Sequence, residues 1–248
     1  MIALASDFDG TLFFEDNRDS ISNLDIKSIK QFQTNGSLFG ICTGRPYSGI
    51  KEYLDNKIDL DFSILSSGAL ILDSQLNIVY EQCIKESLVK DILKQFSKYL
   101  IVIQANGNIY AFFKVISMPI SQIVVSSFDE IPKGHFYGLS IITSDETEAQ
   151  KLKIEILSRY SQVIDVHQNK QYLDIVKKGC SKGNAINYLR KYLLADKIAG
   201  IGDSFNDITL LDASDIGFTF KNSPKELKKV ADHIVGSVHE AISILERE

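Results

Sequence analysis

Two aspartates stand where a short apolar run near the start of the chain ends. The run Ile-Ala-Leu-Ala-Ser over residues 2–6 is followed by Asp7 and Asp9, and then by Gly10 and Thr11. In a buried parallel strand this point is the carboxyl end, where ligands bind in open α/β sheets. Two neighbouring carboxylates repel each other unless a cation or a proton lies between them. The spacing therefore favours a cation or proton site, and the alternative for this stretch alone is a surface turn rich in Asp and Gly.

Other apolar runs also end at polar residues. These residues are Thr43, then Ser66-Ser67-Gly68, and later Asp203 with Asn206 and Asp207. In a parallel sheet they would gather along the same edge as Asp7 and Asp9, and the cluster would hold four carboxylates. Such oxygen-rich, sulfur-free surroundings favour Mg²⁺ over zinc. The Thr43 hydroxyl and the Lys182 ammonium suit an anion beside the metal, so the set predicts phosphoryl transfer.

The elements that must position these residues begin as strand, helix and strand with short loops. Ser22-Asn23-Leu24-Asp25 has the pattern of a capping box and predicts a helix that Asn35-Gly36 ends. Pro46 suits the first turn of a second helix. The apolar runs 37–42 and 62–65 predict buried strands. This order favours a parallel sheet with right-handed crossovers.

From residue 69 the pattern changes to hairpins and amphipathic helices. We expect a hairpin of 70–72 with 78–80 and a helix over about 146–160. Helices interleaved with hairpins indicate an α+β module with an antiparallel sheet, which we place at residues 82–177. Residues 1–81 and 178–248 then form one discontinuous core domain. The predicted fold class is α/β, a doubly wound Rossmann-like parallel sheet core with an inserted α+β cap domain.

The composition is that of an ordinary soluble globular protein. Of 248 residues, 44% are hydrophobic and 24% are charged, and the formal net charge is -5. The scattered basic residues and the acidic balance argue against a nucleic-acid partner. No run reaches the roughly 18 apolar residues of a membrane span, and no basic segment precedes an apolar one at the N-terminus. We therefore expect a cytoplasmic protein with no membrane partner.

The cysteines and histidines show no metal-binding spacing. Cys42, Cys83 and Cys180 are widely separated and lack CxxC or Cys/His patterns, which favours neither a disulfide framework nor a zinc site. Each cysteine is expected to be a small buried or semi-buried residue. Structural or surface roles are expected for the isolated histidines, which are His135, His167, His233 and His239.

Four motifs together resemble those of the haloacid dehalogenase (HAD) superfamily of phosphohydrolases. In the order of that superfamily, they are Asp7-Phe8-Asp9-Gly10-Thr11-Leu12, Thr43-Gly44-Arg45-Pro46, Ser181-Lys182-Gly183 and Gly202-Asp203-Ser204-Phe205-Asn206-Asp207. The resemblance spans the whole chain. The insert between the second and third motifs is similar to the C2-type α/β cap of the Cof-like group of sugar-phosphate phosphatases. Residues 217–224 also look like that group's GVAMGNA segment, loosely matched.

The resemblance implies a role for each motif residue. Asp7 would be the nucleophile that forms an aspartyl-phosphate, and Asp9 would protonate the leaving oxygen and then activate water. Mg²⁺ would bind the Asp7 carboxylate, the Asp9 main-chain carbonyl and the Asp203 carboxylate, with Asp207 orienting that shell. The residues expected to hold the phosphoryl group are Thr43, Gly44, Lys182 and Asn206. The implied substrate is a small phosphorylated metabolite, with a sugar phosphate as the leading candidate.

Some positions depart from the pattern of the family or fit more than one role. Ser67 stands where relatives commonly have Asn, which bears on specificity rather than on the chemistry. The GVAMGNA counterpart is bulkier, with Phe218, Phe220 and Lys221, which could alter the cleft. Arg45 fits either a contact with the substrate or the cap, or a structural donor at a helix start.

Two other functions use a similar set of residues. A phosphosugar mutase would form the same aspartyl-phosphate, but the sequence shows no clear second phosphate clamp. A receiver-like signalling module would gather acids, a hydroxyl and a lysine around a phosphorylated Asp. Receivers need neither Asp9 nor an inserted domain, so both features favour the hydrolase.

Overall fold

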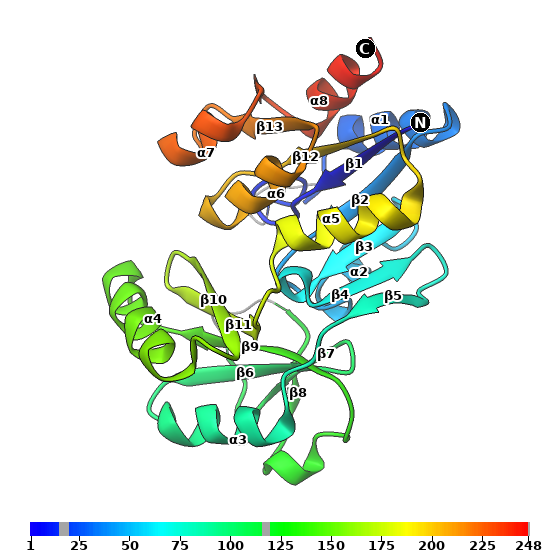
Figure 1. The fold of residues 1–248 in the computed structure, drawn as a ribbon. Helices are drawn as coiled ribbons and strands as arrows, with labels where there is room; N and C mark the ends of the chain where they lie inside the picture. The colour runs from blue at the N-terminus through cyan, green and yellow to red at the C-terminus, as the bar shows by residue number, and fades with distance from the viewer. Residues whose placement is uncertain (15–19, 116–119, 248) are drawn as a thin grey trace.

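An eight-stranded sheet forms the centre of the fold and carries the first strand in its interior. The computed structural model describes residues 1–14, 20–115 and 120–247. The order of the strands is β14-β13-β12-β1-β2-β3-β4-β5, and Figure 1 shows how they lie. Their bounds are β1 Ile2–Ser6, β2 Leu38–Cys42, β3 Phe62–Leu65, β4 Leu70–Asp73, β5 Ile78–Glu81, β12 Lys197–Ile201, β13 Ile216–Phe220 and β14 His233–Val235.

The strands from β14 to β3 in this order are all parallel. β1 pairs with β12 on one side and with β2 on the other, and Leu4 lies opposite both Ala199 and Phe39. The predicted hairpin, β4 with β5, continues the sheet from β3 in antiparallel fashion. The predicted parallel core is therefore confirmed, and the hairpin extends it.

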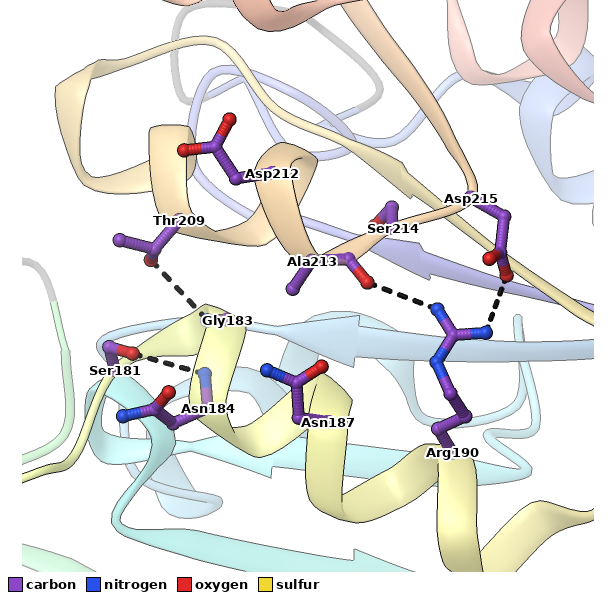
Figure 2. Close-up of a pocket in the computed structure, with 10 residues that line it drawn as sticks. All are labelled: Ser181, Gly183, Asn184, Asn187, Arg190, Thr209, Asp212, Ala213, Ser214 and Asp215. Carbon is purple, nitrogen blue, oxygen red and sulfur yellow. Dashed lines mark hydrogen bonds and ion pairs between the residues drawn. The ribbon is translucent and has the colours of Figure 1, made fainter.

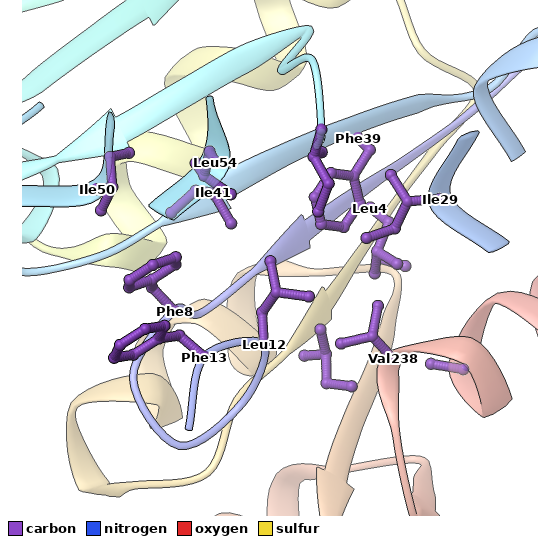
Figure 3. Close-up of a cluster of buried hydrophobic side chains, with 14 of the residues drawn as sticks. Leu4, Phe8, Leu12, Phe13, Ile29, Phe39, Ile41, Ile50, Leu54 and Val238 are labelled. Atoms are coloured by element: carbon purple, nitrogen blue, oxygen red, sulfur yellow. The ribbon is translucent and has the colours of Figure 1, made fainter. Parts of the chain in front are cut away.

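Helices cover both faces of this sheet, as expected of a doubly wound fold. Their bounds are α1 Asn23–Thr34, α2 Ser48–Leu54, α5 Lys182–Leu193, α6 Ile208–Ala213, α7 Lys225–Val230 and α8 Val238–Leu245. Alternate residues of β1 point to opposite faces. Leu4 packs in the cluster that includes Ile29 of α1 and Val238 of α8 (Figure 3). Ala3 and Ala5 pack instead in the cluster that contains residues of α5, α6 and α7.

A second sheet of six strands is formed by the middle of the chain. Its order is β10-β11-β9-β6-β7-β8, and all its pairs are antiparallel except β7 with β8. The bounds are β6 Leu100–Ala105, β7 Asn108–Ala111, β8 Ile123–Val124, β9 Phe136–Ile142, β10 Ile164–Asn169 and β11 Tyr172–Lys177. The chain enters this sheet after β5 and returns to the first after β11. We keep residues 82–177 as the proposed extent of the inserted domain.

The two faces of the six-stranded sheet differ in character. One face packs against α3 (Glu86–Gln95) and α4 (Glu146–Tyr160) through alternate residues such as Ile103, Ile141 and Ile175. The intervening residues include polar ones, Gln104, Ser140 and Asp174, which line a pocket shared with Asp7. The face of this sheet that does not pack against α3 and α4 is therefore a wall of that pocket.

The start of α1 differs from the predicted capping box. Ser22 caps the helix through its Oγ, which accepts a hydrogen bond from the Leu24 N–H at 3.2 Å. The Asp25 carboxylate instead accepts from the backbone N–H of His239 at 2.7 Å. Asp25 is buried against the start of α8, so its side chain joins two helices rather than closing a local cap.

None of the helices in the described part of the chain is long and apolar enough to cross a membrane.

Candidate active site

The carboxyl ends of β1, β2 and β12 meet in one pocket. Asp7 follows β1, Thr43 follows β2 and Asp203 follows β12 by two residues. Backbone hydrogen bonds fix these turns, since the Asp7 N–H donates to the Ile201 carbonyl at 2.9 Å and the Thr43 N–H to the Ile64 carbonyl at 2.9 Å. The pocket has a volume of about 680 Å³, and the predicted site residues on its lining are Asp7, Asp9, Thr43, Gly44, Asp203 and Asn206.

Lys182 lies beneath these residues, between two carboxylates. It is the first residue of α5, and only 2% of it is exposed. Its Nζ donates to Asp7 Oδ1 and to Asp207 Oδ1, both at 2.5 Å. Burial alone would lower the pKa of Lys182, but the Asp207 and Asp7 carboxylates outweigh it and hold the pKa well above its usual value. The side chain is therefore a permanent positive charge beside Asp7.

Asp207 uses both of its oxygens within the protein. Its Oδ1 accepts from Lys182, and its Oδ2 accepts from the backbone N–H groups of Asp203 and Ser204, each at 3.0 Å. Gly202 makes this close fit possible, because a Cβ there would meet Asp207 Cγ at 2.4 Å. The contacts suit a residue that orients Lys182 and the Asp203 loop, and the predicted role of Asp207 in orienting the metal ligands stays a prediction.

Asp7, Asp203 and Asp207 bring carboxylate oxygens within 4.8 Å of one another. Because both Asp207 oxygens are already hydrogen-bonded, Asp7 and Asp203 are the two carboxylates that fit a hard divalent cation. Burial and the Asp207 carboxylate raise the pKa of Asp203 to about 6. Burial and the same carboxylate also raise the pKa of Asp7 well above its usual value, against the effect of Lys182. A bound cation would relieve this repulsion, and oxygen ligands of this kind suit Mg²⁺.

Asp9 lies at the open side of the pocket and is held by Arg45. Arg45 donates from Nε to Asp9 Oδ2 at 2.8 Å and from Nη2 to Oδ1 at 2.5 Å, and its Nη1 donates to the Gly49 carbonyl. The guanidinium also lies over the rings of Phe8 and Phe13, 5.2 and 5.4 Å from their centroids. The sequence left the role of Arg45 open, and the structure makes it the partner of Asp9.

Thr43, Gly44 and Asn206 surround the acids. The Thr43 hydroxyl is buried and accepts from the Arg45 N–H at 3.1 Å. Asn206 Oδ1 accepts from the Ser204 hydroxyl. A Cβ on Gly44 would meet Asp174 Oδ2 at 2.8 Å, so the glycine lets the six-stranded sheet approach the end of β2.

Polar residues on the facing wall form a network that the sequence analysis missed. Ser140 Oγ donates to Asp174 Oδ1 at 2.6 Å, and Ser67 Oγ lies 3.4 Å from Asp174 Oδ2. Gln104 Nε2 donates to the Gly44 carbonyl at 3.1 Å, while the buried Gln104 Oε1 has no hydrogen-bond partner. The signal in the sequence was a single polar residue inside an apolar strand, as in Val102-Ile103-Gln104 or Leu139-Ser140-Ile141.

A second hollow lies between α5 and α6 and has different character. Its volume is about 650 Å³, and its lining includes Asn187, Arg190 and Asp212 (Figure 2). Arg190 donates to Asp215 Oδ2 at 2.6 Å and to the Ala213 carbonyl at 3.0 Å. Because this arginine is already paired within the protein, the hollow offers no free cation there for an anionic ligand.

Comparisons with known proteins identify the family of the chain. A family model described as haloacid dehalogenase-like hydrolase matches residues 4–246. A protein of Haemophilus influenzae named "Putative phosphatase" is 23% identical, with 96% of this chain and 94% of that protein covered.

Solved structures show the same fold. A HAD-like hydrolase from B. subtilis superimposes with a TM-score of 0.85 at 19% identity, covering 99% of each chain. A sugar phosphatase of HAD subclass IIB gives a TM-score of 0.81 at 20% identity, covering 100% of this chain and 98% of the other. Since the family model spans nearly the whole sequence, the chain belongs to the haloacid dehalogenase-like hydrolase family.

Proposed function

We propose that the protein is a Mg²⁺-dependent phosphatase that hydrolyses a small phosphorylated metabolite through an aspartyl-phosphate on Asp7. The observation that carries the proposal is the placement of Asp7 at the end of a buried strand, in contact with Lys182 and on the lining of a pocket that mixes polar and apolar side chains. Membership of a hydrolase family and the phosphatase names of relatives support the same reaction class.

In the first step, an Asp7 carboxylate oxygen attacks phosphorus and the bond from phosphorus to the leaving oxygen breaks. Asp9 gives its proton to that oxygen, so the product leaves as an alcohol. In the second step, Asp9 takes a proton from water as the water attacks phosphorus, which releases phosphate and restores Asp7. Arg45 holds both oxygens of Asp9 and orients this carboxylate, while each oxygen keeps a second lone pair for proton transfer.

The phosphoryl group would be held by residues at the strand ends. Lys182 and Thr43 supply a positive charge and a hydroxyl, with Gly44 and Asn206 as further contacts. Asp7, the Asp9 carbonyl and Asp203 would hold Mg²⁺, which when bound neutralises negative charge on the phosphoryl oxygens. Asp207 would keep Lys182 and the Asp203 loop in place.

The facing wall supports a hydroxyl-bearing leaving group such as a sugar. Gln104 Oε1 is a buried acceptor without a donor, and a buried amide oxygen gains free energy when a donor reaches it. Asp174 is a second acceptor on the same wall, and Ser140 and Tyr172 add hydroxyls. A substrate with several hydroxyl groups could satisfy this set, which favours a sugar phosphate.

The proposal is tested by Asp7→Asn, assayed with Mg²⁺ on a panel of sugar phosphates and on p-nitrophenyl phosphate. We expect kcat/KM to fall by at least about 1000-fold, because the amide is a poor nucleophile. Asp212→Asn, a matched change in the hollow between α5 and α6, should leave activity unchanged. Normal turnover by Asp7→Asn would show that Asp7 is not the nucleophile.

A further inference from the structure

Three potential metal ligands meet where the chain passes from the first sheet to the second. Glu81 is the last residue of β5, and Cys83 lies two residues later. His135 directly precedes β9 of the six-stranded sheet. A backbone hydrogen bond from the Ile84 N–H to the Phe136 carbonyl, at 2.8 Å, holds the two segments together.

The distances from His135 to the other two ligand atoms are within about 0.5 Å of those around one small ion. His135 Nδ1 lies 2.8 Å from Glu81 Oε2 and 3.6 Å from Cys83 Sγ. One ligand atom from each residue lies within 4.8 Å of the others. Around a tetrahedral Zn²⁺, ordinary bond lengths place neighbouring N and S ligands about 3.5 Å apart and N and O ligands about 3.3 Å apart. Only small side-chain shifts are therefore needed to admit the ion.

A neighbouring tyrosine holds the carboxylate in place. Tyr137 Oη donates to Glu81 Oε2 at 3.1 Å, and its ring stacks on His135 with centroids 6.1 Å apart. Outer partners of this kind orient metal ligands in known sites. Without a metal, Tyr137 still donates to Glu81, and His135 Nδ1 still lies within hydrogen-bonding distance of Glu81 Oε2 and Cys83 Sγ.

We propose that Glu81, Cys83 and His135 form a second metal site, for a transition-metal ion such as Zn²⁺. The sulfur, nitrogen and oxygen donor set favours such an ion over Mg²⁺, which prefers oxygen alone. None of these three residues lines the pocket that contains Asp7. Because Glu81 belongs to the first sheet and His135 leads into the second, the ion would join the two sheets where the chain crosses between them.

Formation of the site requires a proton to leave the thiol. Metal binding must release this proton, and binding therefore strengthens as the pH rises.

The experiment uses Co²⁺ as a spectroscopic probe with the full-length chain. We add excess Mg²⁺, to occupy the oxygen-ligand site at Asp7, and titrate Co²⁺ while recording the thiolate-to-cobalt charge-transfer band. We expect one equivalent of Co²⁺ to produce the band and Zn²⁺ to abolish it. Absence of the band from the wild-type protein overturns the proposal.

Variants locate the site. Cys83→Ser should abolish the band, and His135→Gln should weaken Co²⁺ binding by at least about 100-fold. Tyr137→Phe, which removes only the outer hydrogen bond, should weaken it by about 10-fold. Cys180→Ser is the matched control and should keep the band. A band that survives Cys83→Ser, or that is lost only with Cys180→Ser, contradicts the assignment. Circular dichroism checks that each variant is folded. If either Cys83→Ser or His135→Gln does not fold, the other variant alone still tests the proposal.

Discussion

Lys182 shows how one side chain serves both the fold and the proposed chemistry. A buried ammonium is unfavourable unless carboxylates pair with it, and here Asp7 and Asp207 do so at 2.5 Å. The same contacts leave a positive charge beside the carboxylate that would attack phosphorus. Removal of the lysine therefore has consequences for stability as well as for activity.

Lys182→Met should destabilise the protein strongly at alkaline pH and less at acidic pH. Loss of one partner from a buried ion pair costs about 3–5 kcal/mol, because the remaining charges stay buried. The pKa of Asp7 is already raised by burial and would rise further without Lys182, so acidification neutralises Asp7 and reduces the penalty. Urea unfolding at about pH 8 and at about pH 5 measures this difference. An equal loss at both pH values would contradict the explanation.

The proposed acid–base role of Asp9 leads to a kinetic prediction. With p-nitrophenyl phosphate the leaving group needs little protonation, so Asp9→Asn should still transfer the phosphoryl group to Asp7. The second step lacks its base, and kcat should fall by about 100-fold or more. Rapid mixing should then show a burst of one equivalent of nitrophenolate. Slow release of nitrophenolate without a burst would contradict a role for Asp9 in the second step.

At the level of the elements, the two-residue period of the strands decides which side chains reach the pocket. On the six-stranded sheet, Gln104 and Asp174 face the pocket while Ile103 and Ile175 face the helices. We propose that this wall supplies most of the polar contacts to a leaving group. Specificity should therefore respond to changes in these strands.

Gln104→Leu tests whether the six-stranded sheet determines substrate specificity. We expect kcat/KM to fall by about 10- to 100-fold for sugar phosphates that donate a hydrogen bond to Oε1, because that contact is lost. Activity on p-nitrophenyl phosphate should stay near the wild-type value. Gln31→Leu, on the exposed side of α1, is the matched control. Equal losses on both substrates would indicate a general disturbance of the pocket.

The elements themselves were largely predictable from the sequence. The helix expected at about 146–160 is found as α4, and the runs 37–42 and 62–65 contain β2 and β3, because local periodicity and caps determine such segments. Contacts between distant segments were not predictable in this way. Asp25 bonds to His239 rather than to its own helix end, and Cys83 meets His135 although 52 residues separate them.

For the whole molecule, the site forms only when both sheets are in place. The motif residues could be gathered from the sequence because parallel strands end at one edge. The residues of the facing wall could not be predicted from the sequence, since the orientation of the second sheet depends on packing between residues far apart in the chain. The carboxylates of Asp7, Asp203 and Asp207 also repel one another, and this repulsion lowers the free energy of unfolding of the whole protein.

Mg²⁺ should raise the melting temperature more at about pH 7.5 than at about pH 5. In the absence of metal the pKa of Asp203 is raised to about 6, above its value in the unfolded chain. The free energy of unfolding therefore falls as the pH rises toward 6, because the unfolded chain ionises first. Above pH 6 the ionised Asp203 is available to the cation, and below it protons compete. Differential scanning calorimetry measures the shift, which Asp203→Asn should reduce at the higher pH.

The two crossings between the sheets lie next to each other. Lys177 Nζ, at the end of β11, donates to Gln82 Oε1 at 2.5 Å, just after β5. The middle of the chain therefore leaves and returns at one place, in the manner of a very long loop closed at its base. An insertion with adjacent ends can be lengthened, shortened or exchanged without changing the strand order of the sheet that receives it. The insert, and with it the pocket wall opposite Asp7, can accordingly be exchanged while the strand ends that carry Asp7, Thr43 and Asp203 stay unchanged.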